Sequence, residues 1–383
     1  MLVQDFLRRS TAPDPLADLT NQYAIKVNDY PADGIVLLNY NAFDSPKKHP
    51  ITIECRSLIL DRETFDVISR KFDRFFNFGE FEEFYHDFNF DNCHIMSKED
   101  GSLVGVYYNP HTDKFSISTR SLANAELTND YGFTWYKQIL MAGGFKDDED
   151  FQLRMRTVPD AQIWTFLFEY VSPYNRIVTP YTEPQLVFIG ARRHTGEWMS
   201  KDVMIQYVHY FDSLSIRLPE FYDKPKNIQD VVERANELAN LKEGFVLWDP
   251  DSNKRLKIKS DTYVLAHTLR GETKIPTDKN VFAMIFSGEA DEFLTYFPEY
   301  ETIFVKAQEQ IFKFEYDITA AFYRIKHMTD LKSFAQEAIK HPMSFILFAA
   351  YKNNKHPIKI FYELPEDKRI NTMLKFTSGI KDE

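Results

Sequence analysis

Two groups of charged residues, far apart in the sequence, are of the types that phosphoryl transfer uses. Lys98 begins the sequence KEDGS, where a predicted strand ends in a glycine turn. A lysine amine must lose its proton before it attacks phosphorus, so it needs neighbouring cations that lower its pKa. Strand alternation places the ammonium groups of Lys257 and Lys259 on one face, where they could supply that charge and hold a nucleotide phosphate. We therefore interpret Lys98 as a candidate nucleophile.

Two glutamates stand at the ends of apolar strands in the same part of the chain. Glu169 closes one such strand before the sequence YVSPYN, and Glu243 opens another, GFVLW. Carboxylates in these positions can hold ribose hydroxyls or a magnesium ion, which prefers oxygen ligands. Each feature alone also has an ordinary structural explanation, because a lysine in a turn or on an edge strand is usually solvated. The order of the four motifs along the chain is more specific than any one of them.

This ordered set resembles the covalent nucleotidyltransferases, which comprise DNA ligases, RNA ligases and mRNA capping enzymes. It is most similar to the bacteriophage RNA ligase 1 family, and the resemblance covers about residues 35–300. The motifs that carry it are KEDGSLV from Lys98, FEYVSPYNRIV around Glu169, EGFV from Glu243, and LKIKSDTY ending at Tyr263. The upstream sequences ECRS and SRKFDRFFN also fit.

The resemblance implies a role for each residue of the central motifs. Lys98 would carry AMP as lysyl-AMP, Glu169 would bind the nucleoside, and Glu243 would act near the metal. Lys257 and Lys259 would hold phosphate. The implied cofactors are ATP and Mg²⁺.

The resemblance implies roles for four further residues. Arg56 and Arg74 would reach the leaving pyrophosphate. Tyr263 matches a tyrosine that the family needs for activity, and Asp291 matches a metal contact.

Three positions depart from the family's pattern. Arg74 stands where the family has lysine, and Arg120 stands where it has lysine followed by glycine. Both keep the positive charge, although a planar guanidinium does not place it as an ammonium would. Leu38 replaces a tyrosine near the nucleotide, so a contact there would have to be apolar or through the backbone.

The reaction that the resemblance implies is ATP-dependent RNA ligation in three steps. Lysine attacks the α-phosphorus of ATP and expels pyrophosphate, AMP passes to an RNA 5′-phosphate, and a 3′-hydroxyl displaces AMP. Each step is a phosphoryl transfer helped by positioned cations and magnesium. The expected partner is RNA with 5′-phosphate and 3′-hydroxyl ends, from cleaved tRNA.

The pattern of apolar residues predicts two domains of different class. From about residue 35 to 259, short β-rich runs alternate with turn signals, which predicts an antiparallel α+β fold with helices at 120–143 and 227–241. After Tyr263, apolar residues recur three and four apart, which predicts helices only. We expect an ATP-grasp-like nucleotidyltransferase domain with an N-terminal extension at residues 1–263, and an all-helical RNA-specificity domain at 264–383.

The composition indicates where in the cell the protein is expected and whether it enters a membrane. The N-terminus lacks the features of a secretory signal, and no apolar run approaches the roughly 20 residues that cross a bilayer. Residues 343–351 are expected to form a buried helix. Cys55 and Cys93 are too few for a disulfide framework and fit a reducing cytosol. We expect a monomer in the cytoplasm, that of the host cell if a phage encodes it, without a membrane partner.

The net charge of −11 argues against a protein that coats nucleic acid through a broad basic surface. Any contact with RNA must therefore be local. Lys352, Lys355 and Lys359 lie close together in the predicted helical domain and could bind phosphate, although a solvated helix face explains them equally well.

Three alternatives to an RNA ligase stay open. A capping guanylyltransferase or a DNA ligase would share the lysine chemistry, but both normally follow the catalytic domain with a small β-barrel. A non-catalytic RNA-binding protein could have kept the pocket, but it would not need to keep all five charges of the central motifs.

Overall fold

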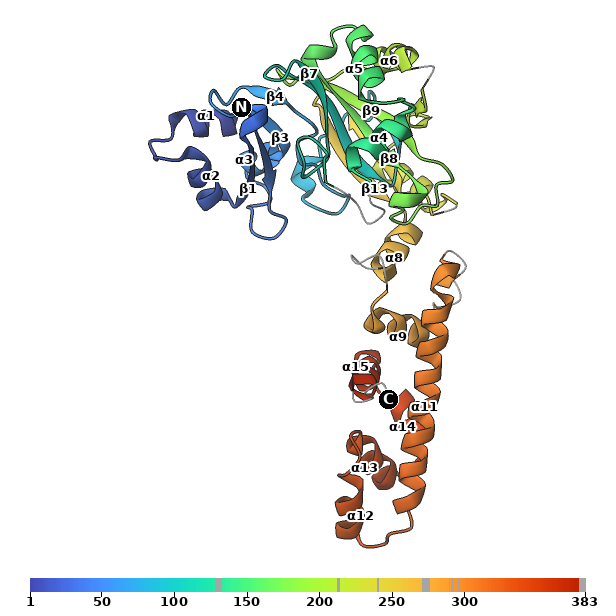
Figure 1. The fold of residues 1–383 in the computed structure, drawn as a ribbon. Helices are drawn as coiled ribbons and strands as arrows, with labels where there is room; N and C mark the ends of the chain where they lie inside the picture. Colours follow the sequence, from blue (N-terminus) through green and yellow to red (C-terminus); the bar gives the residue numbers. More distant parts are fainter. Residues whose placement is uncertain are drawn as a thin grey trace. The chain divides into compact units, whose positions relative to one another are not determined.

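The computed structural model divides into two compact units, Met1–Val264 and Leu265–Glu383 (Figure 1). Each unit is described by itself. The residues that the structure describes are 1–127, 133–211, 214–239, 241–270, 276–288, 290, 293–294 and 297–378.

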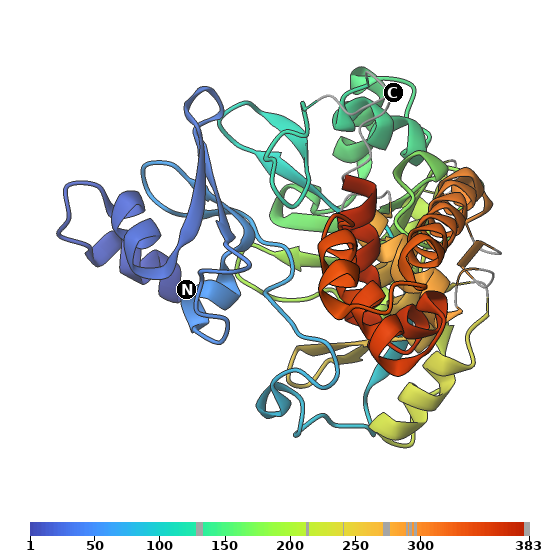
Figure 2. The same cartoon turned by 90° about the horizontal axis from the view of Figure 1, so that it is seen from below.

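The first unit begins with a small antiparallel sheet that helices cover on one face. In Figures 1 and 2 the dark-blue helices α1 and α2 lie on the side of this sheet that faces away from the five-stranded sheet. The strands lie in the order in which they occur in the chain, β1 (Ile25–Tyr30), β2 (Ile35–Tyr40), β3 (Arg56–Asp61) and β4 (Val67–Ser69), and the helices are α1 (Leu2–Arg9), α2 (Pro15–Tyr23) and α3 (Pro50–Glu54).

Alternation along β2 decides what each of its side chains contacts. Val36 and Leu38 pack into the core formed with α1 and α2, whereas Ile35 and Leu37 pack on the other face, in a cluster with Tyr107 of the five-stranded sheet. The small sheet therefore lies between its own helices and the larger sheet.

Two further sheets, of five and four strands, hold most of the predicted motifs. All neighbouring strands are antiparallel except β9 and β10, which are parallel. The five-stranded sheet has the order β10 (Ile216–Arg217), β9 (Gln185–Arg193), β8 (Trp164–Val171), β6 (Ser102–Asn109), β7 (Lys114–Ser118), and the four-stranded sheet has the order β11 (Phe221–Tyr222), β5 (His94–Lys98), β12 (Gly244–Asp249), β13 (Lys254–Lys259).

Four helices bury apolar residues against these sheets. The five-stranded sheet shares its core with α4 (Trp135–Gly143), α5 (Asp148–Thr157) and α6 (Lys201–Val208). The sheet β11-β5-β12-β13 packs against α7 (Ile228–Asn236), which starts after its N-cap Asn227, near the predicted start, but ends at Asn236 rather than at 241. The helix expected from residue 120 begins only at Trp135, because Thr134 caps it by accepting a hydrogen bond from the Lys137 N–H.

The described residues of the second unit form helices and no strand. The longest, α11, buries Phe304, Ala307, Ile311, Phe314 and Ile318 at the spacing of three and four that predicted it. The helices, of which α8 spans the boundary between the units, are α8 (Asp261–Arg270), α9 (Asp278–Ser287), α11 (Glu301–Ile325), α12 (Leu331–Ala338), α13 (Ser344–Asn353), α14 (Pro357–Tyr362) and α15 (Glu366–Ser378).

The predicted α+β class is thus confirmed, with antiparallel sheets followed by helices. The run at 343–351 lies in α13, where Ile346, Leu347 and Ala350 are buried, as expected. None of the helices in the described part of the chain is long and apolar enough to span a membrane.

Candidate active site

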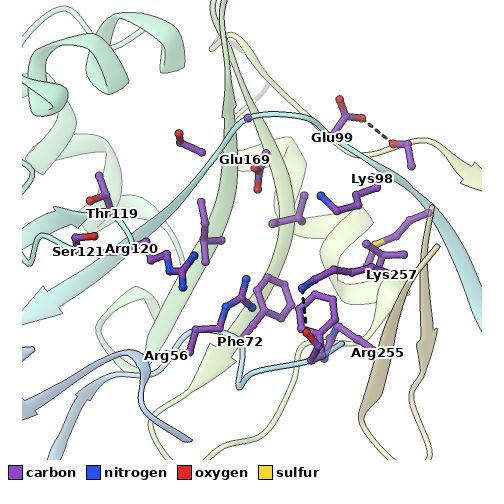
Figure 3. A pocket seen from close by; sticks show the side chains of 18 of the residues that line it. Arg56, Phe72, Lys98, Glu99, Thr119, Arg120, Ser121, Glu169, Arg255 and Lys257 are labelled. Carbon is purple, nitrogen blue, oxygen red and sulfur yellow. Dashed lines mark hydrogen bonds between the residues drawn. The ribbon is translucent and has the colours of Figure 1, made fainter. Parts of the chain in front are cut away.

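A cavity of about 510 Å³ gathers residues from three sheets of the first unit. Lys98 comes from β5, Glu169 from β8, Lys257 from β13 and Arg56 from β3, while Arg120 follows β7. Figure 3 shows these five side chains directed toward a common space. Ligand pockets in proteins usually measure roughly 300–1,000 Å³, so this cavity is large enough for a nucleotide.

The register of the four-stranded sheet brings Lys98 and Lys259 to the same carboxylate. Gly244 at the start of β12 is opposite Lys98 in β5 and opposite Lys259 in β13. Glu243 directly precedes this glycine and is only 4% exposed. Its carboxylate oxygens lie 2.6 Å from the Lys98 Nζ and 2.9 Å from the Lys259 Nζ.

This arrangement determines the charge of Lys98. Burial lowers the pKa of Lys98, but the carboxylate of Glu243, assisted by Glu169 and Asp100, outweighs burial and raises that pKa above its ordinary value. The lowering of the Lys98 pKa that we expected from Lys257 and Lys259 does not prevail in this arrangement. Glu243 lies between Lys98 and Lys259, pairs with both, and favours the charged form of Lys98.

Lys257 differs from Lys259 although both lie on β13. Its Nζ donates to the backbone carbonyl of Phe75 at 2.9 Å and lies 4.6 Å from the centre of that ring. Burial, together with Arg56, Lys98 and Lys259, lowers the pKa of Lys257 to about 6. A bound phosphate would supply the missing counter-charge and favour the protonated form.

Glu169 lies across the cavity from these lysines. It occupies β8, opposite Leu103 of β6, close behind the turn that follows Lys98. Burial raises the pKa of Glu169 to about 8. Glu243, which pairs directly with the Lys98 amine, is therefore the main carboxylate that keeps Lys98 charged, with Glu169 in a lesser role.

The three arginines predicted from the sequence lie over two aromatic rings, one over the first and two over the second. The guanidinium of Arg56 lies 5.1 Å from the Phe75 ring centre, and those of Arg74 and Arg120 lie 4.3 Å and 5.1 Å from the ring centre of Tyr40. Arg56 and Arg120 line the cavity, whereas Arg74 lines a neighbouring pocket of about 220 Å³.

The turn after Lys98 is fixed by Asp100, a residue that the KxDG pattern contained but to which no role had been given. One oxygen of its buried carboxylate accepts from the backbone N–H groups of Val178 and Thr179, both at 2.7 Å, and the other accepts from the Tyr263 hydroxyl at 2.7 Å. A Cβ on the next residue, Gly101, would lie 2.2 Å from a backbone oxygen. Only glycine fits there.

Comparison with known proteins shows to which family a chain with this site belongs. The sequence profile of the family described as RNA ligase matches residues 54–263. The chain belongs to this RNA ligase family. The matched range begins two residues before Arg56 and ends at Tyr263, so it contains every site residue predicted from the sequence motifs except Leu38 and Asp291.

Three relatives in the family are similar to this chain over much of its length. A protein of Autographa californica nuclear polyhedrosis virus, described as a putative bifunctional polynucleotide kinase/RNA ligase, is 32% identical over 77% of this chain and 42% of its own length. A putative RNA ligase of Thermovibrio ammonificans is 24% identical over 65% and 61%, and an RNA ligase of Rhodothermus phage RM378 is 22% identical over 66% and 67%. The chain thus spans less than two thirds of the first two relatives.

In this RNA ligase family member, Leu38 does not lie at the cavity. It is fully buried on the face of β2 that packs against α1 and α2. The aromatic residue beside Arg74 and Arg120 is Tyr40, which follows an irregularity in the β2–β3 pairing at Leu38 and Asn39. The structure gives no support to a nucleotide contact from the Leu38 side chain.

The described residues do not form a complete metal site by themselves. No group of three or more metal-binding side chains occurs in the part of the chain that the structure describes, and Asp291 lies outside it. Magnesium usually keeps several waters and binds through one or two carboxylates together with substrate phosphates. The carboxylates of Glu169 and Glu243 fit that partial role, but both oxygens of Glu243 already accept from lysines.

Sequence reasoning overlooked several residues that shape the site. Glu99 lines the cavity and pairs with Arg217 at 2.9 Å, and Arg255 lines it with a buried guanidinium 3.8 Å from the Trp198 ring centre. Arg255 lies on β13, like the two predicted lysines. Its position two residues before Lys257 is the one signal that places it on the same face.

We predict that Tyr263→Phe slows the proposed reaction of Lys98 about tenfold and destabilises the first unit. The substitution removes the donor to a buried carboxylate, which costs about 1–3 kcal/mol of unfolding free energy. Thermal melting and the rate of AMP labelling measure the two effects. Tyr210→Phe, which removes an exposed hydroxyl, should change neither. Wild-type behaviour of Tyr263→Phe in both assays would show that the bond does not hold the turn.

Proposed function

We propose that this chain is an ATP-dependent RNA ligase that joins 5′-phosphate and 3′-hydroxyl ends through lysyl-AMP and RNA-adenylate intermediates. The observation that carries the proposal is the position of Lys98, which lines a nucleotide-sized cavity and pairs with buried Glu243. Membership of the RNA ligase family supports the choice of substrate.

In the first step the neutral amine of Lys98 attacks the α-phosphorus of ATP, a nitrogen–phosphorus bond forms, and pyrophosphate leaves. Glu243 keeps the amine in place and is the nearest acceptor for its proton. Lys257 and Arg56 line the cavity where the phosphates would lie, and Lys259 holds Glu243 from the other side. Bound magnesium would neutralise phosphate charge.

The later steps need an RNA 5′-phosphate to take AMP from Lys98 and a 3′-hydroxyl to displace AMP from the RNA. Cleaved tRNA is the substrate that we propose. A polynucleotide kinase makes the 5′-phosphate that such a ligase consumes, and the description of the baculovirus relative pairs these two activities.

We assign adenylyl transfer to residues 1–263 and the choice of RNA to the helical residues 264–383. Lys352 and Lys359 are exposed on the helical unit and could contact phosphate, whereas Lys355 pairs with Glu363 at 2.8 Å. We also propose that the active form is a monomer. Cys55 and Cys93 are buried free thiols, which fits a reducing cytosol.

We predict that the rate of lysyl-AMP formation rises with pH from about pH 6 to about pH 9. The pKa of Lys98 lies above its ordinary value, so the neutral fraction of the amine grows by up to about tenfold per pH unit below that pKa. Single-turnover labelling at saturating ATP measures this dependence. A rate that is flat or falls over this range would mean that loss of the Lys98 proton does not limit the step.

Two incubations test the proposed function. The protein is mixed with magnesium and labelled ATP or labelled GTP, and the covalently bound label is counted. It is then given RNA with 5′-phosphate and 3′-hydroxyl ends, or DNA of the same sequence. We expect label from ATP only and joining of RNA. Label from GTP would indicate a capping enzyme, preferred joining of DNA would indicate a DNA ligase, and no label would leave an RNA-binding protein.

A further inference from the structure

A buried lysine that the proposed reaction does not use lies beside the cavity. Lys71 is 1% exposed, and its Nζ lies 3.4 Å from the backbone carbonyl oxygen of Ser57 and 3.2 Å from that of Thr119. It pairs with no carboxylate among the residues that the structure describes. Burial and the nearby Arg56 lower the pKa of Lys71 to about 7.

A glycine in a neighbouring strand leaves the space that the Lys71 side chain occupies, and this glycine weakens the strand. A Cβ on Gly105, in the middle of β6, would lie 2.4 Å from the Cε of Lys71. Glycine weakens the interior of a strand, and an apolar residue of similar size is usually at least as stable as a buried charge. The combination of Lys71 with Gly105 is therefore poorly explained by stability alone.

The two carbonyl groups that Lys71 binds belong to neighbours of cavity arginines. Ser57 directly follows Arg56 on β3 of the small sheet, and Thr119 directly precedes Arg120 after β7 of the five-stranded sheet. The Ser57 hydroxyl donates to the Arg120 carbonyl at 2.6 Å, which links the same two segments again. Ser57 has a φ of +57°, a left-handed conformation that this junction holds in place.

We propose that Lys71 is a positioning residue that fixes the separation of Arg56 and Arg120 across the nucleotide cavity. The two arginines come from different sheets, so their separation depends on the hydrogen bonds that join those sheets directly beside them. One nitrogen of Lys71 bonds at once to Ser57 of the small sheet and to Thr119 beside the five-stranded sheet, and Lys71 contacts neither the cavity nor Lys98 in its described interactions. Its effect on nucleotide binding rests on the proposed function, whereas its effect on the two segments does not.

Lys71→Met removes the donors and keeps the length of the side chain. We expect the KM for ATP in lysyl-AMP formation to rise about tenfold or more, because misplaced binding groups weaken nucleotide binding. The maximal rate should change less than about threefold, because Lys98 and Glu243 stay in place. Lys114→Met, an exposed lysine at the start of β7, is the matched control and should leave both constants unchanged.

Gly105→Ala is a second variant that displaces the amine without removing it. We expect the KM for ATP to rise in the same direction but less than in Lys71→Met. A lower melting temperature with an unchanged KM in both variants would reduce Lys71 to a structural residue and overturn the proposal.

Amide hydrogen exchange tests the positioning role without any catalytic assay. In Lys71→Met, the amides of residues 56–58 and 119–122 should exchange at least about tenfold faster than in wild type, while those of β8 and β12 keep their rates. Unchanged exchange at both segments would overturn the proposal whether or not the chain is a ligase. If wild type forms no lysyl-AMP, the proposed function fails and this exchange result alone decides the role of Lys71.

Discussion

Lys98→Ala is expected to lower lysyl-AMP formation by more than about a thousandfold, because it removes the atom that forms the covalent bond. Lys98→Arg should fail as completely, because a guanidinium keeps the charge but does not release its proton in proteins. Labelling from ATP measures both variants. Their melting temperatures establish whether the fold survives.

Lys98→Ala also distinguishes the formation of lysyl-AMP from the final sealing of RNA. Sealing of RNA that already carries AMP on its 5′-phosphate does not need a lysine nucleophile. Lys98→Ala should therefore join such pre-adenylylated RNA while it fails on RNA with an ordinary 5′-phosphate. Labelling of Lys98→Ala at the wild-type rate would contradict the assignment of the nucleophile, and loss of sealing as well would show that the substitution damages the whole site.

Glu243→Ala is expected to combine a large loss of stability with a large loss of rate. It leaves the ammonium groups of Lys98 and Lys259 without their shared buried carboxylate, and removing one partner of a buried ion pair costs about 3–5 kcal/mol. A misplaced Lys98 should slow lysyl-AMP formation about a hundredfold. Denaturant unfolding and single-turnover labelling measure the two effects. Glu237→Gln, at an exposed position after α7, is a control that should change neither.

Glu243→Gln should shift the pH dependence of the labelling rate, an effect that general damage to the fold would not produce. The amide keeps the shape of the side chain but not the charge that raises the pKa of Lys98. The pKa of Lys98 should therefore fall, and the rise of the labelling rate with pH should move to lower pH. An unshifted pH profile would mean that Glu243 does not set the charge of Lys98.

Sequence patterns predicted which residues meet but not how they are paired. The spacing of Lys257 and Lys259 placed both on one face of a strand, and the structure brings both near Lys98. The pattern could not show that Glu243 separates Lys98 from Lys259, because that depends on the pairing of Gly244 with strands on either side. Register between distant strands is a tertiary property that local alternation does not contain.

The errors have the same origin. The family resemblance placed Leu38 near the nucleotide, but alternation turns its side chain toward α1 and α2, and Tyr40 lies beside the arginines, which leaves only the predicted backbone contact for Leu38. Lys71 was quoted only as part of a motif, since nothing local indicates that its ammonium ends beside Ser57 and Thr119. Helical periodicity after Tyr263 needed no such long-range knowledge, and that prediction was confirmed for the described residues.

Peptide mass spectrometry after incubation with ATP and magnesium tests the central claim most directly. We predict a single AMP group, attached to the peptide that contains Lys98 and located on the nitrogen of that residue by fragmentation. The group should disappear when RNA with a 5′-phosphate is added, because AMP passes to the RNA end. AMP on any other residue, or no covalent AMP at all, would contradict the account of Lys98 as the nucleophile of this site.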